Sequence, residues 1–162
     1  MKYPPSRYRM ITENLSISGP LTEASARFLH DSGCRKIITL PGGFVSSDVV
    51  ITLKQRKMEV EHFPLELHLP KPLYTEQLDR VLNKITHVLN RGSRLHLVSS
   101  PEMIEVGCIV GLLRQEQEEW DISAAAAEAL DISRFAESEA VLDVVLNGKI
   151  INVLNRNKIF PT

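Results

Sequence analysis

The chain has 162 residues, of which 43% are hydrophobic, so it can bury one sizeable core and is too short for two ordinary domains. Its formal net charge is −1, and its 19 basic and 20 acidic residues are mixed along the sequence, which excludes a broad cationic surface. We therefore expect a single domain over residues 1–162, with neither nucleic acid nor a membrane as a partner.

The sequence contains few signals for a compartment or a metal. Residues 1–5 lack the apolar core of a signal peptide, and no apolar run approaches the roughly 20 residues that span a bilayer. The two cysteines, Cys34 and Cys108, form no disulfide framework and no metal-ligand spacing. We expect a cytoplasmic protein without a metal or a cofactor.

Short apolar strands alternate with amphipathic helices along most of the chain. In chain order, the predicted elements are a strand over residues 15–18, a helix over 21–31, a strand over 36–40, a helix over 49–56, a strand over 58–63, a helix over 74–89, a strand over 95–98 and helices over 107–114, 123–130 and 133–146. This alternation predicts a mainly parallel sheet that helices cover on both faces.

The helix predicted over residues 107–114 has no polar side chain between Gly107 and Arg114, so we expect it to run through the core. The segment 99–106 before it has no strong periodicity and is predicted to be a loop. Ligands of parallel sheets bind beyond the carboxyl ends of the strands, and this loop directly follows such an end. It is therefore the expected position of a site.

Several stretches between about residue 4 and residue 147 resemble the plant and fungal atypical dual-specificity phosphatases, including the fungal Oca group. The most specific is the segment 106–114, Val-Gly-Cys-Ile-Val-Gly-Leu-Leu-Arg, which is similar to the helix after the family's catalytic loop. The other similar stretches are residues 15–20, 28–40, 134–136 and 141–143. The resemblance implies a three-layer α/β fold with a mainly parallel central sheet flanked by helices.

The family's catalytic loop reads His-Cys-x5-Arg-Thr/Val-Gly. Its cysteine attacks phosphorus as a thiolate, backbone N–H groups hold the phosphate oxygens, and the arginine binds two of those oxygens. Aligning the loop on Gly107 places Ser99 at the cysteine and Glu105 at the arginine. The resemblance then implies a degenerate phosphate loop made of Ser99, Ser100, Pro101, Glu102, Met103, Ile104, Glu105, Val106 and Gly107.

The remaining residues offer no replacement for this chemistry. His96 precedes Ser99 by three positions and should leave the strand on the opposite face, so it cannot act as a base for the Ser99 hydroxyl. A carboxylate at about 4 Å from a phosphate is repelled by about 4 kcal/mol at an effective dielectric constant near 20. Glu102 and Glu105 would therefore oppose phosphate binding. The family's acid-bearing loop corresponds to residues 65–72, which contain no aspartate.

Two residues of this region have a structural interpretation. Cys108 and Arg114 satisfy a bare Cys-x5-Arg spacing, but the apolar helix between them favours core packing of the cysteine. Glu105 is expected to lie near the N-terminal turn of the helix that starts near Gly107 and to occupy the place of a phosphate. The helix dipole would then lower the pKa of this carboxyl below its unfolded value.

We therefore expect a catalytically inactive, phosphatase-like protein, a pseudophosphatase, that regulates or scaffolds by binding proteins such as related phosphatase-family members. The alternative is residual activity of the atypical dual-specificity type on phosphotyrosine, phosphoserine or inositol pyrophosphates. A non-catalytic sensor of another ligand is a third possibility. An exposed apolar patch would favour the first function, and a concave cationic pocket would favour the second.

Overall fold

The structure is a computed structural model that describes residues 2–147. Its elements are, in chain order, β1 (Arg9–Thr12), β2 (Leu15–Ser18), α1 (Glu23–Asp31), β3 (Lys36–Thr39), α2 (Ser47–Gln55), β4 (Glu59–His62), α3 (Lys71–Asn90), β5 (Leu95–Val98), α4 (Ile104–Gln117) and α5 (Ile122–Ser133). Residues 138–147 form a further helix.

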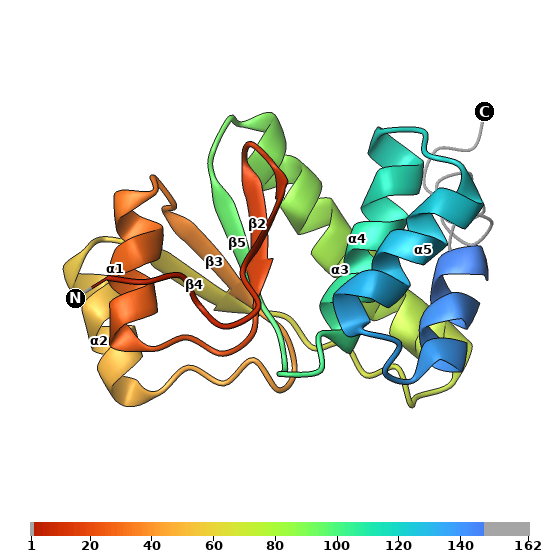
Figure 1. Cartoon of the computed structure of the whole chain (residues 1–162), viewed down its shortest axis with the longest axis horizontal. Helices are drawn as coiled ribbons and strands as arrows, with labels where there is room; N and C mark the ends of the chain where they lie inside the picture. The colour runs from red at the N-terminus through yellow and green to blue at the C-terminus, as the bar shows by residue number, and fades with distance from the viewer. Residues whose placement is uncertain (1, 148–162) are drawn as a thin grey trace.

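The strands form a five-stranded sheet in the order β1-β2-β5-β3-β4. β5 pairs in parallel with β2 and β3, and β3 pairs in parallel with β4, whereas β1 is antiparallel to β2. Helices α1 and α2 cover one face, and α3, α4 and α5 lie on the other (Figure 1). The predicted three-layer α/β fold with a mainly parallel sheet is confirmed. The edge strand β1 was not predicted from the sequence.

Side chains of β5 alternate between the two faces of the sheet and belong to two different apolar clusters. Leu95 and Leu97 belong to the larger apolar cluster, which also contains residues of α3 and α4. Val98 belongs to a smaller cluster with Leu29 of α1 and Leu53 of α2. Because one strand contributes to both clusters, the sheet joins the two helical layers into one packed unit.

Helix α4 is longer than predicted. It begins at Ile104 and ends at Gln117, so Ile104, Glu105 and Val106, which were expected in a loop, form its first turn. The prediction was wrong because the local sequence shows no periodicity there, whereas Ile104 and Val106 are buried by the rest of the fold. The predicted core position of this helix is confirmed, since all residues from Val106 to Leu113 are buried.

The contact between α4 and α5 depends on a small residue. A Cβ atom at Gly107 would lie 2.9 Å from the carbonyl oxygen of Ala129 in α5, closer than real Cβ contacts occur. α5 extends to Ser133, beyond the predicted end at residue 130, and Arg134 then takes a left-handed conformation that ends the helix. Residues 134–137 form a turn, so the predicted helix over 133–146 starts late, at residue 138.

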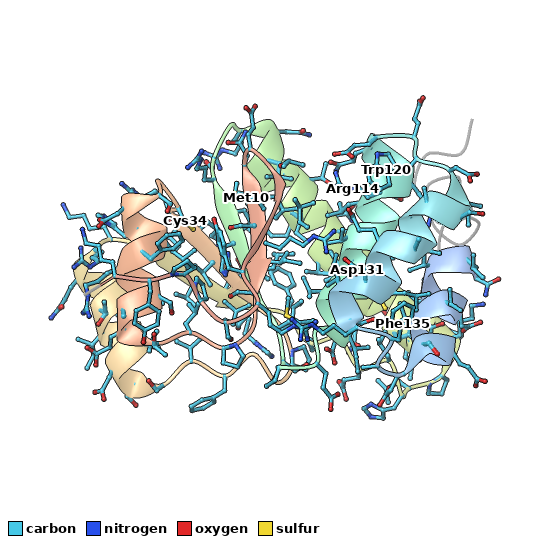
Figure 2. All side chains as sticks on the ribbon, viewed as in Figure 1. Met10, Cys34, Arg114, Trp120, Asp131 and Phe135 are labelled. Atoms are coloured by element: carbon cyan, nitrogen blue, oxygen red, sulfur yellow. The ribbon has the colours of Figure 1, made fainter. Side chains whose placement is uncertain are left out.

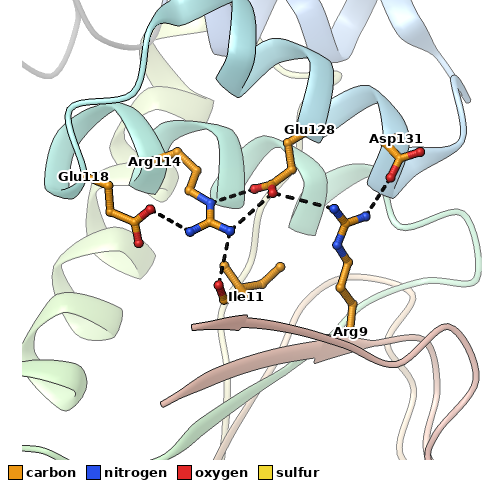
Figure 3. Close-up of polar contacts among 6 residues, drawn as sticks. All are labelled: Arg9, Ile11, Arg114, Glu118, Glu128 and Asp131. Carbon is orange, nitrogen blue, oxygen red and sulfur yellow. Dashed lines mark hydrogen bonds and ion pairs between the residues drawn. The ribbon is translucent and has the colours of Figure 1, made fainter. Parts of the chain in front are cut away.

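Arg114 joins α4 to its neighbours (Figure 3). Its guanidinium lies 2.7 Å from the Glu128 carboxylate of α5 and 2.6 Å from that of Glu118, and it also donates to the Ile11 carbonyl at 3.1 Å. It lies 4.4 Å from the centre of the Trp120 ring. Arg114 therefore has a structural role in holding α4, α5 and β1 together.

Among the described residues, no helix is long and apolar enough to cross a membrane.

Candidate functional site: the loop between β5 and α4

The site expected from the sequence lies at the carboxyl ends of the parallel strands. The loop of residues 99–103 follows β5, and its Ser99 N–H donates to the Ser18 carbonyl at the end of β2, at 2.9 Å. The loop after β3 packs directly on it. A Cβ atom at Gly42, where φ is +77°, would lie 2.6 Å from Cβ of Ser100. Only glycine permits both this backbone angle and this contact.

Met103 turns the chain from the loop into α4. It has φ 60° and ψ 26°, a left-handed conformation that costs a non-glycine residue about 1–2 kcal/mol. Its N–H donates to the Ser100 carbonyl at 3.0 Å, and its side chain is buried. As the N-cap of α4, Met103 provides no side-chain hydrogen bond to the first turn. The N–H groups of that turn must find other acceptors.

Glu105 lies in this first turn, as expected, but its predicted pKa direction is wrong. Burial raises the pKa of its carboxyl, and the nearby carboxylates of Glu102 and Glu137 raise it further. Hydrogen bonds from its own backbone N–H and from the Ser100 side chain lower the pKa, but each has a smaller effect than burial. The partial removal of this carboxylate from water is the largest effect on its pKa.

Two polar atoms of the segment lack partners. The Ser99 side chain is fully buried, and its Oγ has no hydrogen-bond partner among the described residues. Oε2 of Glu105 is also a buried atom without a hydrogen-bond partner among the described residues. A buried polar atom without a partner costs about 1–3 kcal/mol. The unpaired Oγ of Ser99 and Oε2 of Glu105 are therefore each expected to reduce the stability of the fold.

The His96 ring is hydrogen-bonded within the sheet. Its side chain is fully buried, with Nδ1 2.7 Å from Oγ of Ser16 and Nε2 2.7 Å from Oγ of Ser18. Burial lowers the pKa of His96 to about 3. Tyr8 stacks on the ring at 6.0 Å. Both ring nitrogens are therefore occupied by β2, and the histidine is not available as a base for Ser99.

Both cysteines are buried side chains of the core. Burial raises the pKa of Cys108 to about 12 and that of Cys34 to about 11, so both thiols are protonated at neutral pH. Figure 2 shows Cys34 on the side of α1 and α2, away from Arg114 of α4. The core interpretation of the Cys108–Arg114 spacing is confirmed, because Arg114 is bound to Glu128 and Glu118.

Arg7, which was not predicted as a site residue, holds the loop in place. Its guanidinium donates from Nη1 to the Pro101 carbonyl at 2.7 Å and from Nη2 to the Ile132 carbonyl at 2.5 Å. Burial, and then the charge of Arg134, lower the pKa of Arg7. No local pattern marks this residue, because its partners are 94 and 125 positions away.

A cavity of about 300 Å³ lies beside the loop. Its lining includes Met103 of the loop together with Arg7, Arg9, Arg134 and Asp131. Arg9 is paired with Asp131 at 2.8 Å. The cavity is cationic, but Ser99 and Glu105 are not among its lining residues, and neither is a cysteine. It can attract an anion, yet it supplies no thiol to attack one.

The segment expected to correspond to the acid-bearing loop, residues 65–72, follows β4 and runs into the start of α3. There the Glu66 side chain accepts from Nε2 of Gln77 at 3.2 Å, and Oε1 of Gln77 accepts from the Glu66 N–H at 2.7 Å. The ring of His68 is 3.8 Å from Glu66 and is mostly exposed. Glu66 is thus fixed by α3.

This arrangement of sheet, covering helices and loop is the fold of phosphatases of the tyrosine and dual-specificity type. The core catalytic domain of the PP-IP phosphatase SIW14 from S. cerevisiae, in complex with citrate, has a TM-score of 0.72 and 16% identity, over 99% of this chain and 98% of that chain. TpbA from P. aeruginosa in complex with pTyr has a TM-score of 0.61 and 15% identity, over 87% and 91%. Tk-PTP in its active form has a TM-score of 0.65 and 17% identity, over 86% and 95%.

Neither a protein-family model nor a curated protein matches the sequence. At these identities the solved structures share a fold with the chain.

Proposed function

We propose that the chain is a pseudophosphatase: a phosphatase-like protein without phosphatase activity that regulates or scaffolds by binding other proteins. The observation that carries the proposal is the composition of the segment from the end of β5 into the first turn of α4. Residues 99–107 contain neither a cysteine nor an arginine, and they place two carboxylates there instead. Phosphatase-like proteins are the first partners to test.

The surroundings of the segment support the loss of catalysis. The Ser99 hydroxyl is buried, and the nearest histidine in sequence is neutral and bound to Ser16 and Ser18. The carboxyl of Glu105 interacts with its own backbone N–H at the start of α4, where a phosphate would need that donor. A thiolate cannot come from Cys108, because burial keeps this thiol protonated.

Large apolar side chains in exposed positions support a function in protein binding. Phe44 is 76% exposed and lies in the β3–α2 loop, two residues after the glycine that packs on Ser100. Phe135 is 67% exposed in the turn that ends α5, where Figure 2 shows it. Aromatic side chains are enriched in protein interfaces, so Phe44 and Phe135 are the candidate contact residues.

The first test is turnover. Purified protein should release no phosphate above background from a small aryl phosphate, from phosphotyrosine or phosphoserine peptides, or from an inositol pyrophosphate. The Ser99→Ala and Cys108→Ala variants should not differ from the wild type. Turnover that either substitution abolishes would overturn the proposal and would establish the alternative, a residual atypical dual-specificity phosphatase.

A second test asks whether Glu105 opposes anions. Glu105→Arg should increase the stabilisation by sulfate, measured as the shift in melting temperature, because a guanidinium can bind two oxygens of the anion. Glu13→Arg, an equal change of charge in the exposed β1–β2 turn, is the matched control. Equal shifts in melting temperature with sulfate in the wild type and in both variants would show that Glu105 does not oppose anion binding by the loop.

Protein binding is tested by capture with tagged protein from the native cell, followed by identification of the bound proteins. A specific partner should be retained by the wild type and lost by Phe44→Ser. Ile51→Ser, which removes another exposed apolar side chain, on α2, is the matched control and should retain the partner. Equal loss in both variants, or no specific partner at all, would contradict the proposed binding function.

A further inference from the structure

Besides the cavity near Met103, a cleft lies at the amino-terminal ends of the parallel strands, where these strands begin. It has a volume of about 350 Å³, and residues from the starts of β3 and β4, from the turn after α2 and from the last turns of α3 line it. Its basic side chains are Arg35, Lys36, Lys57, Lys84 and Arg91. His87 and Ser93 also contribute to the wall. The loop of residues 99–103 lies at the opposite ends of these strands.

Acidic groups neutralise only part of this charge. Lys36 lies 2.9 Å from Glu61 and 3.5 Å from Glu59, and Lys84 lies 3.6 Å from Glu61. Lys36 lowers the pKa of Glu61, as expected for a carboxylate next to an ammonium group. Within residues 2–147, neither Lys57 nor Arg91 has an ion-pair partner, and the Arg35 guanidinium donates only to the backbone carbonyls of His30 and Cys34.

The position of α3 explains some of these cations but not all. A helix C-terminus stabilises cationic side chains by about 0.3–1 kcal/mol, which accounts for Arg91. Arg35 and Lys57 belong to other segments and converge on the same concave space. Like charges in one cleft repel each other, and an anion within it removes this repulsion.

We propose that this cleft binds a compact polyphosphate, a small anion with three or more phosphate groups. The volume is in the range of small-molecule sites and is too small for a folded partner. The cations approach from several segments, so a single phosphate would leave most of them unpaired, whereas several linked phosphates reach them together. This binding is independent of the β5–α4 loop and of the proposed loss of catalysis.

Isothermal titration of the full chain with inorganic tripolyphosphate, at about 0.15 M salt, tests the proposal. Arg91→Gln and Lys57→Gln should each weaken binding about fivefold or more, because each removes a charge without another partner. Glu59→Gln should tighten binding, since it removes a carboxylate that lines the cleft and is 78% exposed. Lys71→Gln, an equal loss of charge at the far end of α3, should leave binding unchanged.

Three results would overturn the proposal. They are no binding of tripolyphosphate at this salt concentration, equal weakening by Lys71→Gln and Arg91→Gln, and equal affinity for tripolyphosphate and orthophosphate. Vesicles with anionic lipids form a separate arm. Binding to vesicles that depends on Arg91, without binding of tripolyphosphate, would identify a surface for membranes instead. Failure here leaves the turnover prediction unaffected, because the substituted residues lie outside residues 99–107.

Discussion

Glu105 shows how two effects compete at a single carboxyl. The first turn of a helix favours a negative charge, by about 0.3–1 kcal/mol. Burial disfavours the same charge, and Glu102 and Glu137 add repulsion. Burial is the largest contribution, so the folded protein binds a proton at this residue more tightly than the unfolded chain does. The negative charge of Glu105 therefore reduces the stability of the fold at neutral pH.

Glu105→Gln should increase the free energy of unfolding at pH 7 by on the order of 1 kcal/mol, because it keeps the shape and removes a poorly paired charge. The folded-state pKa is raised, so the stability that the protonated carboxyl contributes is fully present below the unfolded value of 4.5 and is lost as pH rises through the folded value. The difference in unfolding free energy between Glu105→Gln and the wild type should therefore become smaller as pH falls toward 4.5. Urea unfolding of both proteins between pH 7 and pH 4.5 measures it. A gain that is independent of pH would contradict this explanation.

His96 should give a pH dependence of the opposite sign. Its folded-state pKa is depressed from 6.5 to about 3, so its contribution is present above 6.5 and is lost as pH falls toward 3. Within this window one proton changes stability by about 1.4 kcal/mol per pH unit. As pH falls from 6.5 toward 3, the wild type should therefore lose unfolding free energy relative to His96→Leu. His68→Leu, at an exposed histidine, is the control and should keep the dependence of the wild type.

At the scale of elements, α4 is held by packing on all sides and by one charged network at its end. The close approach of Gly107 to Ala129 brings α5 against α4, and Arg114 connects the same two helices through Glu128. The side chains of Arg114 and Glu128 are both only 11% exposed, so their pairing is screened much less than a surface pair. This network positions the helix that follows the candidate site.

Arg114→Met should destabilise the protein by on the order of 3 kcal/mol, because it leaves a mostly buried carboxylate without its main partner. Arg9, at 3.6 Å from Glu128, compensates for part of the loss. Arg80→Met breaks an exposed pair with Glu76 at the same spacing of four residues as Arg114 and Glu118, and should cost less than about 0.5 kcal/mol. Chemical denaturation of the two variants gives the comparison. Equal costs would show that the Arg114 network is not important for stability.

At the scale of the whole molecule, one sheet separates two apolar clusters and carries different features at its two edges. The loop with Ser99 lies at the carboxyl edge, and the basic cleft with Arg91 lies where the strands begin. Because the strands contribute side chains to both clusters, the two layers should not unfold separately.

The expected single domain therefore predicts one cooperative transition. Trp120, the only tryptophan, lies in the connection between α4 and α5 and reports on the α4–α5 layer by fluorescence. Far-ultraviolet circular dichroism reports on all helices, including α1 and α2. The two signals should give the same midpoint in urea. A separate fluorescence transition would show that the α4–α5 layer unfolds independently and that the single-domain prediction is wrong.

The succession of strands and helices followed from the sequence because it depends on local periodicity and on turn residues. The helix predicted over residues 74–89 corresponds to α3, and the strand over 95–98 to β5. The boundaries of α4 did not follow, since Met103 starts the helix in a left-handed conformation that its residue type does not favour. β1 was missed because its two apolar residues, Met10 and Ile11, are adjacent, so Arg9–Thr12 shows no alternation of apolar and polar side chains.

The sequence alone determined the chemistry that the loop lacks, because the absence of a cysteine and an arginine from residues 99–107 does not depend on folding. Only the tertiary structure decided the sign of the pKa shift of Glu105, the contact of Arg7 with Pro101 and the convergence of Arg35, Lys57 and Arg91. The reason is physical. Periodicity and residue type act between neighbours in the chain, whereas desolvation and electrostatic interactions depend on groups that only the fold brings together.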